Sequence, residues 1–207
     1  MGALIDLHAH TTISSGCSVT EPRALIEAAR RRGLDGVCVT DHYAVQGANV
    51  TQELGREMGF PVFRGVEART DLGDMLVFGY YQAIPEGISL PDLCWYVHEV
   101  RGLVFAAHPF HVSGGPSLAL VFRDRGWLLS EDWGRVEVLR ELDGVETMNG
   151  QVAPEANADA GELAGALEVP GIGGSDAHAP DMVGTAATRF PGNIASDGDL
   201  VAALRQG

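Results

Sequence analysis

The sequence predicts an α/β fold in which parallel strands close into a barrel. Short apolar, strand-like runs alternate with helix-like segments about seven times along the 207 residues, which is typical of repeated strand–helix units. Five of the strand-like runs end at a histidine or a carboxylate. A closed ring directs side chains from strands all along the chain at one centre, whereas an open sheet concentrates its site between a few strands. We therefore favour the barrel over the open sheet.

The first strand–helix unit has clear boundary signals. Residues 3–7 form an apolar, strand-like run. Thr20 is a candidate N-cap for the helix that follows, and Pro22 suits its first turn. Residues 30–32 are arginines near the expected end of this helix, and Gly33 just beyond them is an ordinary stop signal. The inward stripe of the helix has helical spacing and consists of Ala24, Leu25, Ala28 and Ala29.

The later elements follow from the same patterns. Residues 75–80 are expected to form an extra strand beside the strand that holds Glu67. Ser89 and Pro91 open a helix. The residues of that helix expected to face inward are Leu93, Tyr96, Val97 and Val100. Further helices are expected over residues 51–58, 131–142, 155–167 and 196–205, and further strands over residues 144–148 and 185–190.

Side chains that can bind metal follow the strand-like runs. His8 and His10 come directly after the first run, and their i, i+2 spacing places both on one face of an extended segment. Asp176 and His178 repeat this spacing late in the chain, and Glu67 is the best candidate to bridge two cations. Further nitrogen ligands at strand ends are His42 and His108. Imidazole and carboxylate together form a ligand set for zinc, manganese or iron.

This ligand set suits the hydrolysis of a phosphate ester. A bound cation lowers the pKa of water to roughly 7, so hydroxide is available at neutral pH. Two or more cations can also hold the attacking and leaving oxygens of an in-line displacement. Positioning and charge neutralisation supply most of the rate of phosphoryl transfer.

The composition excludes several classes of protein. The net charge of -14 repels a polyanion, so we discount a protein that grips long DNA or RNA. The chain contains no lysine, which excludes a lysine carbamate, a Schiff base and a P-loop. No apolar run approaches the ~20 residues needed to cross a bilayer, and no secretory signal precedes the first strand. We therefore expect a soluble cytoplasmic protein.

Five short motifs contain the candidate ligands. They are Asp6-Leu7-His8-Ala9-His10-Thr11, Val39-Thr40-Asp41-His42, Gly65-Val66-Glu67, Ala107-His108-Pro109 and Gly174-Ser175-Asp176-Ala177-His178. In this order they resemble the motifs of the PHP family, which is named after polymerase and histidinol-phosphate phosphatase. The resemblance extends from Leu4 to about Arg205 and implies one domain over residues 1–207. It also implies a distorted (β/α)7 TIM-like barrel that holds two or three divalent metal ions (Zn, Mn or Fe).

The resemblance assigns roles by position. The first metal would be held by His8, His10, Glu67 and Asp176. The second would be held by Glu67 and His108, and the third by His42 and His178. Asp176 would also orient the nucleophilic water or protonate the leaving oxygen, which makes Asp176 and Glu67 the catalytic candidates. Asp41 would orient its neighbours instead of binding metal directly.

The chain departs from the family pattern at two places. Many relatives have an acid or a histidine shortly after the first motif, where this chain reads Ser14-Ser15-Gly16-Cys17. Ser15 is a poor ligand, and Cys17 could replace it only if the loop turned inward. Some relatives have His or Cys where this chain has Asn149, whose carbonyl oxygen binds soft metals poorly. We expect the first two metal sites to be occupied and the third to be weak or empty.

Two residues outside the ligand set are candidates for binding substrate. Arg69 follows Glu67 by two positions, so it could share its face and fork onto a phosphate; a surface salt bridge is the alternative. His111 lies in the loop of residues 109–115, where it could contact substrate or supply a missing metal ligand.

The leading interpretation is a metal-dependent phosphoesterase that acts through a metal-bound hydroxide. Its substrate would be a small phosphorylated metabolite or nucleotide. The alternatives are a nuclease or proofreading-type domain acting on nucleic-acid ends, an amidohydrolase, and a non-catalytic metal-binding module. The sequence leaves open the substrate, the metal and the oligomeric state.

Overall fold

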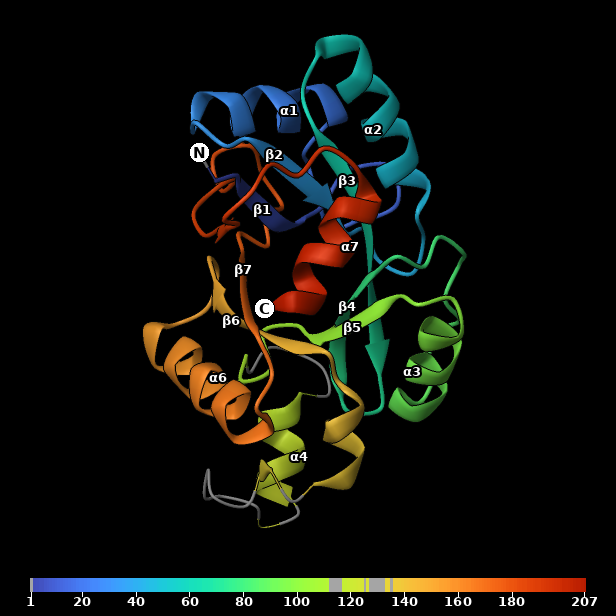
Figure 1. Ribbon diagram of the computed structural model, residues 1–207, viewed down its shortest axis with the longest axis vertical. Coiled ribbons are helices and arrows are strands. Elements are labelled where there is room, and N and C mark those ends of the chain that lie inside the picture. The colour runs from blue at the N-terminus through green and yellow to red at the C-terminus, as the bar shows by residue number, and fades with distance from the viewer. Residues whose placement is uncertain (1, 112–116, 125, 127–132, 135) are drawn as a thin grey trace.

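Eight strands form one sheet that curves into a nearly closed barrel (Figure 1). The computed structural model describes residues 2–111, 117–124, 126, 133–134 and 136–207. Neighbouring strands follow the order β7-β6-β5-β4-β3-β2-β1-β8. The strands are β1 (Leu4–Ala9), β2 (Gly36–Val39), β3 (Val62–Thr70), β4 (Gly73–Phe78), β5 (Leu103–Ala106), β6 (Gly144–Asn149), β7 (Gly171–Gly174) and β8 (Thr188–Arg189). The prediction of an α/β barrel is thus confirmed.

Two strands are antiparallel to the other six. The barrel therefore departs from a regular ring of seven parallel strand–helix units. β4 is antiparallel to both β3 and β5, and β8 is antiparallel to β1. Only residues 71–72 separate β3 from β4, which is too short for the crossover that a parallel partner needs. The expected pairing of this extra strand with the Glu67 strand is confirmed, because Glu67 lies opposite Leu76.

Helices pack around the sheet (Figure 1). They are α1 (Pro22–Arg31), α2 (Gln46–Met58), α3 (Leu90–Glu99), α4 (Leu118–Asp124), the 3-10 helix η1 (Glu137–Glu141), α6 (Pro154–Leu167) and α7 (Asp197–Gln206). α1 and α2 share a buried apolar cluster with β1 and β2, whereas α3, α4, η1 and α6 share another with β4, β5 and β6. Within the described residues, no helix combines the length and apolarity needed to cross a membrane.

Two helix predictions were wrong in detail. α1 begins at Pro22 with Glu21, and not Thr20, as its N-cap, because proline at the first helical position fixes the start. Tyr96 in α3 and Val100 directly after it are 49% and 51% exposed, so they do not face inward. The apolar stripe of α3 is narrower than expected and consists of Leu90, Leu93, Cys94 and Val97.

The helix expected over residues 131–142 is present only in part. Residues 137–141 form a short 3-10 helix, while residues 131, 132 and 135 lie outside the described residues. The last helix agrees with its prediction, because the Ser196 hydroxyl caps α7 by accepting a hydrogen bond from the Asp199 amide at 3.1 Å.

α7 closes one end of the barrel. Its Leu200 and Leu204 belong to the same buried cluster as Ile5, Phe63 and Phe105 from the strands. Its first residue, Asp197, accepts a hydrogen bond from the Arg64 Nε near the start of β3 at 2.8 Å. The opposite end of the barrel, where the parallel strands have their C-terminal ends, holds the candidate ligands.

The barrel closes where the chain beyond β7 meets β1. The Asp176 amide donates to the His8 carbonyl at 2.8 Å, and the His10 amide donates to the Ala177 carbonyl at 3.0 Å. The buried Asp6 carboxylate reinforces this seam, since it accepts hydrogen bonds from the amides of Ser175 at 2.8 Å and Gly184 at 2.9 Å. The first and last motifs of the chain are thereby brought into contact.

Replacing Gly174 by alanine should weaken this seam. A Cβ at this position would lie 2.7 Å from the His8 amide nitrogen and 2.9 Å from Glu146 Oε1, and would overlap the His8 Cβ. We expect Gly174→Ala to lower the free energy of unfolding by about 1–3 kcal/mol, as overpacking typically does. Urea denaturation followed by circular dichroism measures the change.

Gly161→Ala is the matched control, because a Cβ there meets no atom within 4 Å on α6. This variant should be neutral or more stable by up to about 1 kcal/mol. Equal stability of the two variants would show that the seam tolerates a side chain at Gly174.

Candidate metal centre

The structure brings all seven candidate ligands together at the ends of the strands. Each lies within or directly after a strand of the barrel. His8 is in β1 and His10 follows it, His42 follows β2, Glu67 is in β3, His108 follows β5, and Asp176 and His178 follow β7. His8, His10 and Glu67 are almost completely buried, so this side of the centre is closed to solvent.

Glu67 is the central carboxylate of this cluster. Its two oxygens lie near the ring nitrogens of four histidines. The distances are 3.0 Å to His108 Nε2, 3.1 Å to His42 Nδ1, 3.3 Å to His10 Nε2 and 3.5 Å to His8 Nε2. A carboxylate with both oxygens among imidazoles has the geometry required to bridge two cations.

Three groups of donors among the described residues could each hold one cation. Within each group, one donor atom per residue lies within 4.8 Å of the others. The groups are His8, Glu67 and His108; His8, His10 and Asp176; and His10, His42 and His178. Buried imidazole and carboxylate donors fit zinc, manganese or iron, so the residues present suit the metals that the sequence predicts.

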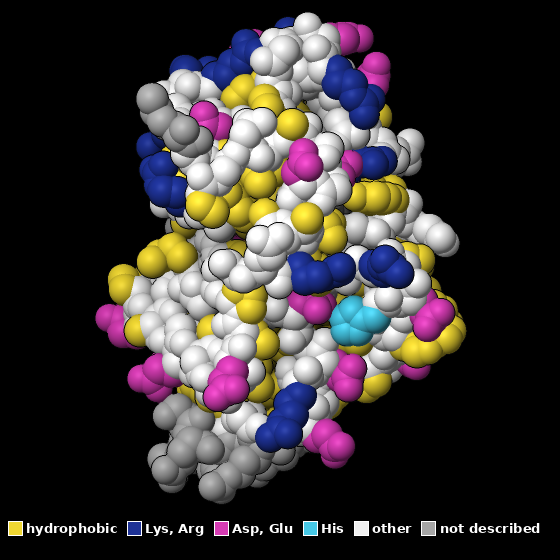
Figure 2. All heavy atoms as spheres, in the orientation of Figure 1, with side chains coloured by type: hydrophobic (Ala, Val, Ile, Leu, Met, Phe, Trp, Pro, Cys, Tyr) yellow, Lys and Arg dark blue, Asp and Glu magenta, His cyan; other side chains and the backbone are white. Residues whose placement is uncertain are grey.

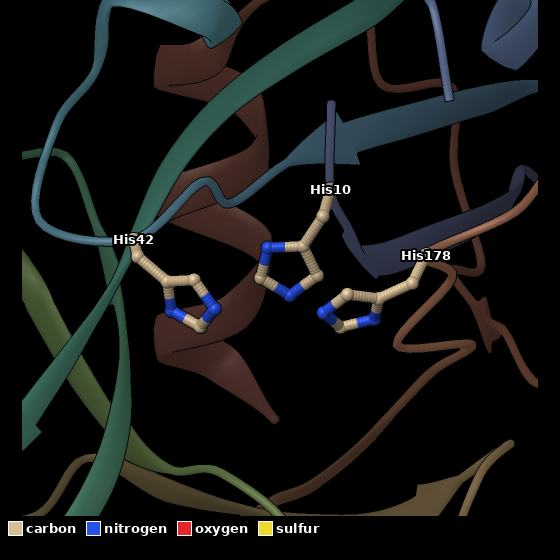
Figure 3. Close-up of side chains that lie close together, drawn as sticks. All are labelled: His10, His42 and His178. Carbon is tan, nitrogen blue, oxygen red and sulfur yellow. The ribbon is translucent and has the colours of Figure 1, made fainter. Parts of the chain in front are cut away.

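The third group consists of three imidazoles that point toward one another (Figure 3). Ring centroids lie 4.7 Å apart for His10 and His42, and 4.3 Å apart for His10 and His178. Position-based assignment had placed only His42 and His178 here. His10 therefore adds a donor to the group that was expected to be weak.

Ser15 orients His10 instead of acting as a ligand. Its hydroxyl donates to Asp41 Oδ1 at 2.9 Å, and its oxygen lies 3.1 Å from His10 Nδ1. Since the hydroxyl proton is directed at Asp41, the serine oxygen accepts from His10 Nδ1–H, and the other ring nitrogen faces the centre. Asp41 also accepts from the Thr11 amide at 2.6 Å, which agrees with its expected orienting role.

Glu146 is a site residue that the sequence analysis missed. It lies in the middle of β6, is completely buried, and its Oε1 accepts a hydrogen bond from His8 Nδ1 at 2.9 Å. Its Oε2 accepts from the His108 amide and from Asn149 Nδ2, both at 2.9 Å. The available signal was a lone acid within an otherwise apolar strand start, Gly144-Val145-Glu146.

Of the other two doubtful positions, Asn149 is engaged in hydrogen bonds and Cys17 is exposed. The Asn149 amide nitrogen faces Glu146 and Asp176, while its oxygen accepts from the Gln151 amide at 2.8 Å. Cys17 is exposed and belongs to none of the three donor groups.

The two candidate substrate residues lie beside the centre. Arg69 donates through Nε and Nη2 to both oxygens of Asp74, at 2.7 and 2.9 Å, so the salt bridge forms. Arg69 and His111 nevertheless line the same small pocket as His108. The His111 ring stands edge-on to the His108 ring, with centroids 5.7 Å apart.

Crowded carboxylates and imidazoles shift the acidities of the centre. Burial opposes a charge on His108, but its hydrogen bond to Glu67 raises the pKa to about 9. Burial likewise opposes a charge on His8, yet Glu146, Asp176 and Glu67 raise its pKa well above the usual range. Burial lowers the pKa of His10. A proton on His8 Nε2, 3.1 Å from His10 Nε2, therefore takes the position in which a cation would bind.

Comparison with known proteins agrees with this geometry. The PHP domain family matches residues 6–113, and the PHP-associated family matches residues 154–207. Because the first match covers more than half of the chain, the chain belongs to the PHP family.

Three relatives illustrate the range of the family. An uncharacterized protein of Methanocaldococcus jannaschii is 32% identical over 114 residues, which is 51% of this chain and 67% of that protein. A PolC-type DNA polymerase III of Oceanobacillus iheyensis is 41% identical over 64 residues, 31% of this chain but 4% of the polymerase. A phosphoribosyl 1,2-cyclic phosphate 1,2-diphosphodiesterase of Eggerthella lenta is 36% identical over 62 residues, 30% of this chain and 23% of the enzyme.

A solved structure shares the fold over nearly the full length. It is a protein of Bifidobacterium adolescentis that is provisionally described as a metal-dependent phosphoesterase. The two structures superpose with a TM-score of 0.68 at 19% identity, covering 98% of this chain and 96% of the other.

Metal binding should release protons and strengthen with pH up to about 9. The raised pKa values of His8 and His108 mean that both hold protons at neutral pH before a cation binds. Lower pH favours these protons and weakens binding, whereas higher pH removes them. Calorimetric titration of Zn²⁺ in buffers of different ionisation enthalpy measures the number of protons released and the metal affinity. No proton release near pH 7.5, with affinity flat up to about pH 9, would contradict the assigned shell.

Proposed function

We propose that this PHP-family chain is a metal-dependent phosphoesterase that hydrolyses an ester bond of a small phosphorylated metabolite or nucleotide. The observation that carries the proposal is the position of Glu67, whose oxygens lie within 3.5 Å of ring nitrogens from four strand-end histidines. When bound, divalent cations supply Lewis acidity that lowers the pKa of water and neutralises phosphoryl oxygens.

Asp176 is the residue best placed to act on the attacking water. Its Oδ1 lies 3.3 Å from His10 Nε2 and 3.5 Å from His8 Nε2, and 13% of its side chain is exposed at the edge of the centre. Although burial opposes it, the charge on His8 holds the pKa of Asp176 below its usual range. An ionised carboxylate orients water by accepting a hydrogen bond from it, so this role fits better than protonating the leaving oxygen.

Arg69 and His111 would bind the phosphate from the pocket beside His108. The hydrogen bonds from Arg69 to Asp74 raise the pKa of the guanidinium, so it stays charged. Asp74 accepts hydrogen bonds from Nε and Nη2 of Arg69, so Nη1 is left to donate to a phosphate. Arginine is a common partner of phosphate in proteins. A phosphate at this pocket would lie next to the donor group of His8, Glu67 and His108.

The surface charge supports a small substrate. With a net charge of -14, the chain repels a long polyanion. On the face in Figure 2, arginine and acidic side chains are interspersed, and the described side chains there form no continuous basic stripe. The cyclic-phosphate diesterase of Eggerthella lenta, which matches 30% of this chain, acts on a small phosphorylated sugar by its name.

Replacing Asp176 by asparagine should abolish most turnover. We expect the Mn²⁺- or Zn²⁺-loaded protein to hydrolyse at least one member of a panel of phosphate monoesters and diesters. Asp176→Asn should lower kcat by about 10²–10⁴-fold, because the carboxylate that orients the attacking water is lost. Release of inorganic phosphate or alcohol measures the rate.

Asp199→Asn is the control, since Asp199 is an exposed acid on α7 at the other end of the barrel. Metal-loaded protein that is inert on the whole panel would favour a non-catalytic metal-binding module. Tight, salt-sensitive binding of single-stranded DNA would instead favour the nuclease.

Arg69→Met should raise KM for a phosphate ester about tenfold, with a smaller change in kcat, because it removes one charged contact to the phosphate. A tenfold change in KM corresponds to about 1.4 kcal/mol of binding free energy. Steady-state kinetics on the best panel substrate measure both constants. Arg56→Met, which removes an exposed arginine paired with Glu53 on α2, is the matched control. Loss of thermal stability with an unchanged KM would assign Arg69 to its salt bridge with Asp74 alone.

A further inference from the structure

We propose that Glu146 is the positioning residue that decides which nitrogen of His8 faces the cation, an inference that rests on the proposed function. Glu146 is completely buried in β6, and three donors engage its two oxygens. These are His8 Nδ1, the His108 amide and Asn149 Nδ2, each at 2.9 Å.

The acceptor-only chemistry of a carboxylate fixes the His8 tautomer. An ionised carboxylate has no proton to donate, so His8 Nδ1 must carry the hydrogen of this bond. In the neutral ring, Nε2 then keeps its lone pair. That atom lies 3.5 Å from both Glu67 Oε2 and Asp176 Oδ1, at the centre of the ligand cluster. A histidine held in this way presents the correct nitrogen to a metal.

The second oxygen of Glu146 acts on another ligand. It accepts a hydrogen bond from the backbone amide of His108. The φ angle of His108 is 27°, which is unfavourable for any residue other than glycine. The His108 ring in turn reaches Glu67 Oε1 at 3.0 Å. Strained backbone persists only where its surroundings hold it in place. One carboxylate therefore supports two ligands of one donor group, His8 and His108.

The chain leaves space for this carboxylate. A Cβ on Gly174 would lie 2.9 Å from Glu146 Oε1 and would overlap the His8 side chain. The glycine at the end of β7 thus allows the acid and the imidazole to meet inside the barrel. Two of the three donors that engage Glu146 belong to His8 and His108, which are ligands of the centre, and a packing role alone does not explain that.

Glu146→Gln tests this role without changing size. A glutamine oxygen can accept from His108 N–H and Asn149 Nδ2–H, but the amide nitrogen then points at His8 Nδ1 and donates to it. This reversal would place the His8 hydrogen on Nε2, where it blocks a cation. We expect Zn²⁺ affinity to fall by about 10–100-fold, the usual effect of losing such a partner. Competition titration with a zinc chelator measures the affinity.

Nitrogen-15 NMR at saturating Zn²⁺ gives a readout that a merely structural role would not move. Wild-type His8 should show a metal-bound Nε2 and a protonated Nδ1, and Glu146→Gln should lose that signature. Glu146→Asp provides a second variant if glutamine impairs folding. The shorter carboxylate keeps the charge, so it should retain the tautomer while losing affinity, because it cannot span both His8 and His108.

Asp143→Asn is the matched control. Asp143 also pairs with a histidine, His98 Nε2 at 2.9 Å, and also accepts from a backbone amide, that of Val104 at 2.8 Å, but outside the metal centre. Its variant should keep wild-type zinc affinity. Glu146→Gln with unchanged affinity and an Nε2-bound His8, or an equal loss in Asp143→Asn, would overturn the inference. Absence of phosphatase activity in wild-type protein would overturn only the proposed function, because zinc binding is measured separately.

Discussion

The seam between β1 and the chain beyond β7 is the constraint on which the centre depends. It joins residues 6–10 to residues 174–178 through parallel backbone hydrogen bonds, with the Asp6 carboxylate accepting from amides on the far side. Burial raises the pKa of Asp6 to about 6 in spite of these donors, so the seam carries an electrostatic cost. Closure of the barrel is what brings His8 and His10 next to Asp176 and His178.

The buried charges of the centre impose a second constraint. Glu67 and Glu146 are almost fully inaccessible, and burying carboxylates is unfavourable unless positive charge or donors compensate. Protonated His8 and His108 provide that compensation, and bound cations would take the place of these protons. Metal binding would therefore stabilise the folded protein, since a ligand that binds only the native state stabilises it.

Much of this arrangement could be predicted from the sequence because strand ends carry a positional signal. A histidine directly after an apolar run, as at His42 or His108, is visible without coordinates. Glu146 lacked that signal, because it lies inside β6. Its role arises from contacts with His108 and His8, which are 38 and 138 positions earlier in the sequence. The exposed Tyr96 was misjudged for a different reason: helical spacing gives the stripe but not its width.

The two departures from the family pattern show that a replaced ligand can keep an organising role. Ser15 binds no metal in this arrangement, yet its oxygen contacts the His10 ring and the His42 amide at 3.1 Å each. Asn149 likewise donates to Glu146 and, at 3.4 Å, to Asp176. Both side chains are neutral, so each removes a potential charge from the ligand set while preserving the orientation of the ligands that remain. The capacity of the centre for cations therefore depends on how these hydrogen-bond partners orient the rings as well as on how many ligands the chain supplies.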